Sequence, residues 1–533
     1  MIEPQATELV DTSNDPNQPS DEQRGIVRAA AILAIGNIAS RLLGLARETV
    51  KANLYGASGL LSAYEIAAYV PISLYDLIVG GMVNSALVPV FSDYAPKERR
   101  HELWAVLSTV LSVATVILVL VVGLVELFAP QIAWLVGANE FDDPQLTATA
   151  VSLMRMAAPA VIFLSIASIL TGALYALKRF VVPAFLGAVF NGTIVVVALF
   201  YPDQIQSLVW GLMLGSILQI VVQWPALRDA RLRWHFDWKH PAVRRILKLY
   251  APILAGLVVS QLAIAFSYNL ATRTGDQSIS YMRFATTLYQ FPLGLIVTAL
   301  SIATLPTLSR QAVGELDAFK QTLSEGVNLV IALILPATAG LFALAAPIVA
   351  LLFEHGAFTA ADTETTALVL GFYLFGLPFA GVDQMLVFAS YARKDTWRPA
   401  LVGVVATIVY SITAVLLLKP LGLLSLMVAD AVKHITHTVI MVFILRQQVG
   451  SLAGYGTTTT TAKSLAAAIL TGLAAYFAAE RVTAVVNSSG FIGKLIPVLI
   501  GGLAGLTVYL AMVYLLNIKE TKSLRQIFSR RKQ

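Results

Sequence analysis

Charged residues are scarce in this sequence, and cysteine is absent. Of the 533 residues, 13% are charged and 57% are hydrophobic, whereas soluble domains contain about 25% charged residues. The composition therefore excludes an ordinary soluble protein. Without cysteine, a disulfide framework, a thiolate metal site and a cysteine nucleophile are also excluded.

Catalytic motifs are absent as well. The sequence contains no P-loop, no His-Glu-x-x-His and no Ser/His/Asp set that stands out, so we expect neither an enzyme nor a bound cofactor. Active transport by this chain would then use an ion gradient or the membrane potential, which supplies about 2.3 kcal/mol per charge per 100 mV. No motif identifies a coupling ion.

Long apolar runs of about 20 residues fill most of the chain, and this is the length of a helix that crosses a 30 Å hydrocarbon core. The windows between charged or Pro/Gly-rich breaks predict fourteen such helices. They start near residues 28, 62, 104, 148, 181, 206, 247, 280, 323, 364, 399, 421, 463 and 490. We therefore predict an all-α polytopic membrane protein.

The basic residues are distributed unevenly among the segments between these helices. If the N-terminus is cytoplasmic, the cytoplasmic segments contain 27 of the 37 Lys and Arg residues. The opposite loops contain five, namely Lys51, Arg273, Lys419, Arg481 and Lys494. Cytoplasmic loops are enriched in Lys and Arg, so this distribution predicts two cytoplasmic termini and an even number of spans.

Two segments outside the predicted spans have distinct compositions. Residues 1–24 are polar and acidic and lack the features of a cleavable signal, so we expect a retained, disordered tail. The segment from Arg228 to Lys248 is basic and contains Trp234, Phe236 and Trp238. Such a mixture occurs in nucleic-acid-binding proteins, but we favour an interfacial helix on an anionic leaflet.

A short pattern occurs twice along the chain, 216 residues apart. Tyr175-Ala176-Leu177-Lys178 with Pro183, Ala184 and Gly187 returns as Tyr391-Ala392-Arg393-Lys394 with Pro399, Ala400 and Gly403. Chance similarity between apolar helices is the alternative to duplication. Because the offset covers six spans, duplication predicts two halves of the same orientation. Parallel repeats of this kind place a substrate path between two bundles that rock against each other.

Ionisable residues inside the predicted spans cost about 2.5–3.5 kcal/mol each, so they face a bundle interior or a watery cavity. The first helix contains Arg41, Arg47 and Glu48, and the second contains Glu65 and Asp76. Arg41 and Glu48 lie two turns apart on one face. Two interpretations are open. These residues form a structural ion-pair network, or they line a cationic cavity in which arginine forks bind phosphate.

The second half also contains ionisable residues within its spans. Arg283 and Asp383 lie on separate helices, and a stripe with i, i+3, i+4, i+7 spacing consists of Asp430, Lys433, His434 and His437. This spacing places the stripe on one helical face, so we expect polar surroundings. The two histidines adjoin a lysine and lack a third ligand, so we predict no metal site.

Several segments have the character of family motifs. They are Ser40-Arg41-Leu42-Leu43-Gly44-Leu45-Ala46-Arg47-Glu48, Tyr55-Gly56-Ala57, Ala86-Leu87-Val88-Pro89-Val90-Phe91, Phe291-Pro292-Leu293-Gly294, Leu305-Pro306-Thr307-Leu308-Ser309, Gly356-Ala357-Phe358-Thr359 with Asp362-Thr363, and Tyr391-Ala392-Arg393-Lys394-Asp395-Thr396. These segments resemble the MurJ/MviN family, the lipid II flippases of the MOP transporter superfamily. The resemblance runs from about residue 28 to residue 516.

The resemblance implies fourteen transmembrane helices, arranged as two parallel six-helix lobes in a V plus two extra C-terminal helices that form a groove for a lipid tail. The expected units are a disordered acidic cytoplasmic tail (1–24), an N-lobe (25–230), a basic cytoplasmic linker (231–248), a C-lobe (249–446), helices 13 and 14 (447–516) and a basic cytoplasmic tail (517–533). The implied location is the bacterial cytoplasmic (inner) membrane.

The resemblance further implies a function in peptidoglycan biosynthesis, cell wall biogenesis and cell shape. Family members flip lipid II, an undecaprenyl-pyrophosphate-linked precursor, from the cytoplasmic to the outer leaflet by alternating access. The expected partners are this lipid-linked anionic saccharide and membrane lipids, without nucleic acid, and a monomer suffices. The alternatives are a flippase for another lipid-linked oligosaccharide, an ion-coupled exporter of small amphiphiles, and a non-transporting membrane scaffold.

The resemblance also assigns roles to single residues. Arg41 and Arg47 match two arginines that the family places in its cavity, and Arg283 lies one turn before the family's helix 8 arginine, which is Thr287 here. We expect these three arginines to bind the substrate. The expected charge partners in the empty cavity are Glu48, Glu65 and Asp76.

Four positions in the second helix depart from the family pattern. Tyr75 and Asp76 stand where the family has an arginine pair, Gly80 replaces a glutamate, and Ser62 replaces an aspartate. A cavity with fewer cations should bind a diphosphate less strongly.

Overall fold

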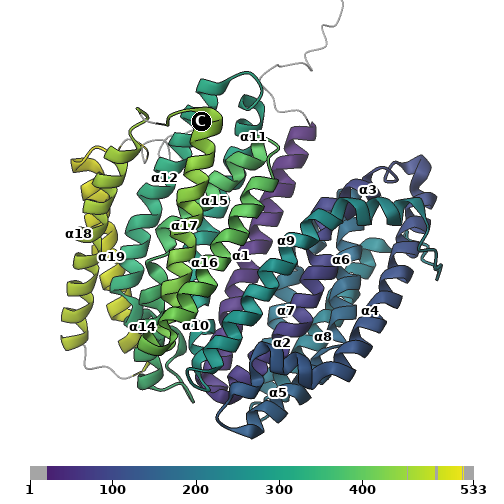
Figure 1. The fold of residues 1–533 in the computed structure, drawn as a ribbon, viewed down its shortest axis with the longest axis horizontal. Helices are drawn as coiled ribbons and strands as arrows, with labels where there is room; N and C mark the ends of the chain where they lie inside the picture. The colour runs from purple at the N-terminus through teal and green to yellow at the C-terminus, as the bar shows by residue number, and fades with distance from the viewer. Residues whose placement is uncertain (1–20, 453, 486–489, 519, 521–533) are drawn as a thin grey trace, which may run out of the picture.

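The computed structural model describes residues 21–452, 454–485, 490–518 and 520, and these form helices joined by short loops (Figure 1). Twelve helices within these ranges are long and apolar enough to cross a membrane, and up to thirteen spans result if a bent helix pair forms one span. The predicted all-α polytopic membrane fold is confirmed. Most of the two expected tails, residues 1–20 and 521–533, lies outside the described residues.

The first eight α-helices form an N-terminal group. They are α1 (Asp21–Tyr55), α2 (Gly59–Tyr75), α3 (Val88–Ser92), α4 (Arg100–Val136), α5 (Pro144–Ala157), α6 (Ala160–Ala176), α7 (Val181–Phe200) and α8 (Gln206–Gln223). Figure 1 shows α1 along the inner edge of this group, beside the C-terminal helices. Helix α1 therefore contributes its side chains to the region between the two groups.

The following helices form a C-terminal group. They are α9 (Pro241–Thr272), α10 (Ser278–Pro292), α11 (Thr298–Gln311), α12 (Leu316–Ala343), α13 (Ala345–Phe353), α14 (Ala360–Leu374), α15 (Leu377–Ala392), α16 (Trp397–Leu421) and α17 (Leu424–Val449). Helices α14 and α15 are the bent pair, with an angle of 44°. At the outer edge, α18 (Thr457–Val485) and α19 (Phe491–Leu515) pack beside α12 (Figure 1).

The predicted repeat is visible in the backbone. Lys178 and Lys394 are two of the three non-glycine residues in the described chain that have a positive φ, with values of 58° and 62°. Each follows a helix, α6 or α15, and the turn closes with a hydrogen bond from the next residue back to the helix, over 2.8 Å in the first half and 3.0 Å in the second. This is the left-handed helix end of a Schellman motif, present twice with the offset of 216 residues found in the sequence.

A second feature repeats as well. The π-helical segment η1 (Asp76–Gly80) directly follows α2, and η6 (Leu293–Val297) directly follows α10. Their first residues differ by 293 − 76 = 217 positions. Because π-helical segments are rare and mostly single-turn insertions, this correspondence makes chance similarity a poor explanation for the repeat.

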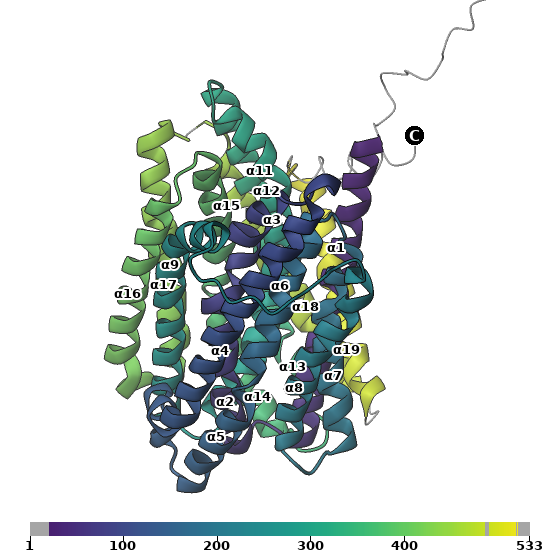
Figure 2. The same cartoon turned by 90° about the vertical axis from the view of Figure 1, so that its right-hand side faces the viewer.

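The basic linker differs from the prediction. Residues 228–240 form no helix, and α9 begins only at Pro241, so the predicted interfacial helix is wrong for this segment. The linker instead runs along α4 (Figure 2), where its backbone N–H groups at Arg233 and His235 donate to Ser108 Oγ and Ser112 Oγ, each over 3.0 Å. These two serines accept hydrogen bonds from backbone N–H groups that would pair with carbonyl groups in a helix. Pro241 favours the start of a helix at its own position, because proline is common at the first helical residue.

The two helix groups touch at the end of the molecule opposite the start of α1, which we call the far end. There the Ala357 N–H donates to the Asn53 carbonyl over 2.9 Å. Gly56 and Gly356 flank this contact with φ values of +60° and +59°, and a Cβ on either would collide with the backbone of the other group. Nearby, Ser62 Oγ and Ser280 Oγ are 3.0 Å apart. The far end is thus closed by backbone contacts that only small side chains permit.

Candidate substrate site

Five charged side chains meet between α1, α2 and α10, and we call them the ion-pair cluster: Arg47, Glu48, Lys51, Glu65 and Arg283. Glu48 lies at the centre, 2.6 Å from both the Arg47 guanidinium and the Lys51 ammonium. Arg283 lies 3.4 Å from Glu48 and 3.7 Å from Glu65, and Lys51 also pairs with Glu65. The cluster therefore joins the N-terminal group to the C-terminal group.

Burial makes this arrangement energetically demanding. Glu48 and Lys51 are only 1% and 2% exposed, and a buried charge without a partner costs several kcal/mol. The three cations and two carboxylates compensate one another and leave one positive charge in excess (3 − 2). The structure thus combines the network interpretation with a surplus of cationic charge.

Lys51 is the member of the cluster that sequence reasoning missed. It was expected in a loop on the opposite side of the membrane, but α1 continues to Tyr55 and Lys51 lies buried in its penultimate turn. The loop prediction for Lys51 is therefore wrong. A signal was present, because Lys51 follows Glu48 at i+3, the spacing of a helical ion pair.

Asn191 of α7 is a second residue that the sequence reasoning did not single out. Its Oδ1 accepts from Arg47 over 2.9 Å, and its Nδ2 donates to the Ser40 carbonyl over 3.2 Å. Asn191 thereby fixes the direction of the Arg47 guanidinium from a neighbouring helix. A lone asparagine in the apolar sequence of α7 was the available signal.

A cavity of about 150 Å³ adjoins the cluster and is lined by the three arginines predicted to bind substrate, Arg41, Arg47 and Arg283. Thr287 lies on the same wall, and it donates from Oγ1 to the Arg283 carbonyl over 2.9 Å. The residue at the family's arginine position and the arginine one turn earlier therefore face one cavity. We call it the arginine cavity.

Arg41 differs from the other two arginines. Within the described residues it forms no ion pair, whereas Arg47 and Arg283 both pair with Glu48. Its guanidinium lies against Gly294 in η6, where any Cβ would collide with it. Arg41 is thus a cation available to an anion that enters the arginine cavity.

Asp76 lies apart from the arginines. It begins η1, and its Oδ2 accepts a 3.5 Å hydrogen bond from Gln261 of α9. The described ion pairs connect Glu48 and Glu65 to arginines but include none for Asp76. Tyr75, its neighbour, bonds to Ser168 over 2.7 Å. In this conformation, two of the three expected charge partners are in the cluster.

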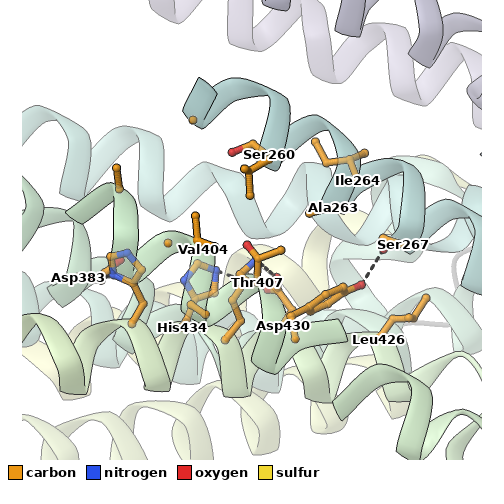
Figure 3. Close-up of a pocket in the computed structure, with 18 of the residues that line it drawn as sticks. Ser260, Ala263, Ile264, Ser267, Asp383, Val404, Thr407, Leu426, Asp430 and His434 are labelled. Carbon is orange, nitrogen blue, oxygen red and sulfur yellow. Dashed lines mark hydrogen bonds and ion pairs between the residues drawn. The ribbon is translucent and has the colours of Figure 1, made fainter. Parts of the chain in front are cut away.

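A second cavity, of about 550 Å³, lies between α9, α16 and α17, and we call it the second-half cavity. It is lined by Asp383 and by the whole stripe of Asp430, Lys433, His434 and His437. Figure 3 shows Asp383, His434 and Asp430 along one side, and Ser260 and Ser267 of α9 along the other. His437 Nδ1 lies 2.6 Å from Asp383 Oδ1, while Asp430 pairs with Lys433 and lies 3.6 Å from His434.

The described residues contain no group of three or more His, Cys, Asp or Glu side chains that could hold a metal ion. In the second-half cavity, the Lys433 ammonium takes the place next to Asp430 that a cation would need. The charged side chains that line the two cavities can form ion pairs and exchange protons.

A third, apolar groove of about 440 Å³ opens between α12, α14 and α18. Leu335, Phe342, Leu374, Leu465 and Tyr476 are among its lining residues. It lies where the first of the two C-terminal helices meets the C-terminal group. Its lining suits a hydrocarbon chain rather than a charged group.

Comparison with known proteins places this geometry in a family. The family model described as "Lipid II flippase MurJ" matches residues 51–495. The lipid II flippase MurJ of Burkholderia cenocepacia is 28% identical over 437 residues, which cover 79% of this chain and 84% of that protein. The probable lipid II flippase MurJ of Vibrio cholerae is 30% identical over 405 residues, covering 72% and 76%.

Solved structures share the fold. A structure titled "Lipid II flippase MurJ, inward closed conformation" superimposes with a TM-score of 0.74 and 24% identity, covering 91% of this chain and 99% of the other. An inward-facing multidrug resistance MATE family transporter of the MOP superfamily superimposes with a TM-score of 0.66 and 13% identity, covering 80% and 98%.

Proposed function

The chain belongs to the lipid II flippase MurJ family, and we propose that it moves lipid II from the cytoplasmic to the outer leaflet of the bacterial inner membrane by alternating access. Members of this family are transporters and not enzymes. The observation that supports the proposal best is the arginine cavity between the two helix groups, in which Arg41 has no ion pair with any described residue.

The proposed topology has fourteen spans. Twelve are the candidate spans counted above, three of which combine two helices each (α2 with α3, α5 with α6, and α10 with α11). The bent pair α14 and α15 supplies another, and α1 completes the set. Helix α1 has 35 residues, which at 1.5 Å per residue reach about 50 Å and exceed a bilayer core. Both termini are then cytoplasmic, in agreement with the distribution of Lys and Arg.

We propose two parallel six-helix lobes, built from residues 25–230 and 249–446 and joined by the linker 231–248. The repeated turns after α6 and α15 and the repeated π-helical segments support duplication with conserved orientation. In this scheme the far end faces the outside and is closed here. Rocking of the lobes would separate Gly56 from Gly356 and open the site outward.

In the proposed mechanism the substrate diphosphate enters the arginine cavity. Arg41 binds it first because this side chain forms no ion pair among the described residues, and Arg47 and Arg283 then exchange part of their pairing with Glu48 for phosphate oxygens. Lys51 remains between Glu48 and Glu65 and keeps these carboxylates compensated. When the cavity is empty, the cluster returns to the pairing seen here.

Size limits what this conformation admits. Ligand pockets usually measure about 300–1,000 Å³, whereas the arginine cavity measures about 150 Å³. It fits phosphate groups but not a saccharide headgroup. The lobes must therefore move apart before the whole headgroup passes, while the prenyl chain stays in lipid along the apolar groove beside α18.

Complementation of a bacterium depleted of its own lipid II flippase tests this proposal. At matched membrane abundance, the parent chain should restore growth and normal cell shape, and the double variant Arg41→Ala/Arg47→Ala should not. A double variant that rescues fully would refute the role of these arginines. A parent that inserts correctly but fails, in a host where another MurJ rescues, would favour another lipid-linked oligosaccharide as the substrate.

A further inference from the structure

The second-half cavity contains titratable side chains that the proposed diphosphate site does not use. Helix α17 contributes Asp430, Lys433, His434 and His437, and α15 contributes Asp383. Ionisable groups inside membrane spans face ion or proton pathways in many transporters. The cavity therefore has the composition of a coupling site.

The other elements around this cavity contribute hydroxyl groups. Helix α14 contributes Tyr373 and α16 contributes Tyr410, whose Oη lies 2.8 Å from Ser267 Oγ of α9. Tyr289 of α10 packs against Tyr373 with ring centroids 5.8 Å apart. Tyr373, Tyr410 and Ser260 thus provide uncharged hydrogen-bond donors and acceptors along the wall.

The charges in the cavity balance only with one added proton. Two carboxylates and one ammonium give −2 + 1 = −1 when both histidines are neutral, and one histidinium brings the sum to zero. Because uncompensated charge inside a membrane span is costly, the site favours one bound proton. Lys433 already pairs with Asp430, so Asp383 is the carboxylate left to share that proton.

The Asp383–His437 pair is the best placed to hold that proton. Its two heavy atoms are 2.6 Å apart, whereas His434 lies 3.6 Å from Asp430 and shares that carboxylate with Lys433. The pair also joins α15 to α17. A change in its charge would therefore act on the packing between two helices.

Helix α9 connects this cavity to the other helix group. One face presents Ser260 and Ser267 to the cavity, and the other contacts the N-terminal group. There the Gln261 carbonyl accepts from Tyr69 over 2.5 Å, and Tyr250 donates to the Leu77 carbonyl over 2.7 Å. A shift of α9 against α16 and α17 thus moves the contact between the groups.

We propose that the second-half cavity binds one proton per transport cycle at the Asp383–His437 pair, and that occupancy of this site changes the position of α9 and the separation of the two helix groups. The link to transport rests on the proposed function. Proton binding and its structural effect can be measured without any substrate.

The test measures the distance between the two groups by double electron–electron resonance on the full chain in lipid nanodiscs. The chain contains no cysteine, so Glu98→Cys and Val313→Cys introduce the only two labelling sites, both exposed and in different groups. Lowering the pH from about 8 to about 5, the range in which histidine titrates, should shift the distance distribution. His437→Gln and Asp383→Asn should each abolish the shift.

Two matched histidine variants serve as controls. His434→Gln in the same cavity and His101→Gln on the exposed surface should keep the parental response. An unchanged parental distribution, a shift that persists in His437→Gln, or a shift lost in His434→Gln alone would overturn the proposal. So would a shift that follows sodium concentration at constant pH. Because lipid II is absent, failure of complementation with a normal pH response would count only against the proposed function.

Discussion

Lys51 and Arg41 lie on the same helix, α1, but have different surroundings and different roles. Lys51 is buried between Glu48 and Glu65, whereas Arg41 lines a cavity and has no ion pair among the described residues. The first residue therefore contributes mainly to stability and the second mainly to binding. This difference makes the two contributions experimentally separable.

Replacing Lys51 by methionine should destabilise the protein. The variant leaves two buried carboxylates with less compensation, and loss of one partner of a buried ion pair costs roughly 3–5 kcal/mol. Thermal unfolding in detergent measures the loss. Lys51→Arg keeps the charge and should retain more of the stability. A Lys51→Met variant as stable as the parent would contradict the description of the cluster.

Replacing Arg41 by alanine should leave stability nearly unchanged and reduce transport. No ion pair is lost, so the change in unfolding free energy should stay within about 0.5 kcal/mol. A hydrogen bond to a charged group contributes about 1.5–3 kcal/mol, which corresponds to a loss of roughly tenfold or more in affinity for a diphosphate lipid. Binding of undecaprenyl pyrophosphate to the purified chain measures this loss. Equal affinities would contradict the assignment.

The sequence predicted most of this site, since charges in apolar helices are conspicuous. Arg41, Arg47 and Arg283 line one cavity, and their role in substrate binding stays a prediction. Lys51 was missed because the end of a helix cannot be located to within one turn from sequence. Asp76 shares a helical face with Glu65, but eleven residues separate the two by about 16 Å along the axis. Asp76 therefore lies far from the arginines, although it shares a helical face with Glu65.

At the scale of elements, the far-end contact depends on two glycines. Gly356 has a φ of +59°, and a Cβ there would collide with Asn53. Gly356→Ala should therefore lower the unfolding free energy by about 1–2 kcal/mol or more and weaken closure of the far end. Thermal unfolding and accessibility of a cysteine introduced at Asn53 measure the two effects.

Gly340→Ala is the matched control for this substitution. Gly340 lies within α12 and has open space around its Cα, so alanine should be neutral or stabilising by up to about 1 kcal/mol. Equal effects of the two substitutions would contradict the role assigned to Gly356.

The ion pair between Asp229 and Arg179 anchors the start of the linker. Hydrogen bonds from Arg179 hold the pKa of the Asp229 carboxyl below its ordinary value. Because the pKa of Asp229 is lowered in the folded state, its pairing with Arg179 stabilises the fold fully at a pH above the ordinary pKa of aspartate. This stabilisation is lost as the pH falls through the pKa that Asp229 has in the folded protein. At neutral pH, Asp229→Asn should therefore release the linker and accelerate trypsin cleavage between Arg228 and Lys239. Cleavage at the parental rate would refute this anchoring.

The positions of the helices were predictable from the sequence, whereas the conformation of the linker was not. Apolar windows of about 20 residues locate spans because lipid imposes both their length and their composition. The conformation of residues 228–240 depends instead on Ser108 and Ser112, two hydroxyls more than 100 positions away along the chain. Aromatic and basic content alone fits an interfacial helix equally well.

For the molecule as a whole, the cavities and contacts describe one conformation of the proposed transport cycle. The far end is closed by backbone contacts, the arginine cavity lies beneath it, and the second-half cavity lies beyond α9. The sequence repeat predicted two equivalent halves, and the turns at Lys178 and Lys394 reproduce its offset. The relative position of the halves could not be predicted, since alternating access requires at least two arrangements of the same sequence.

Transport of a fluorescent lipid II by the purified chain in proteoliposomes tests the central claim most directly. The fraction of headgroups that becomes accessible to a membrane-impermeant quencher should rise with time for the parent, and at least roughly tenfold more slowly for Arg41→Ala at equal protein content. The same rate for both proteins, or a parent no faster than empty vesicles, would contradict the account.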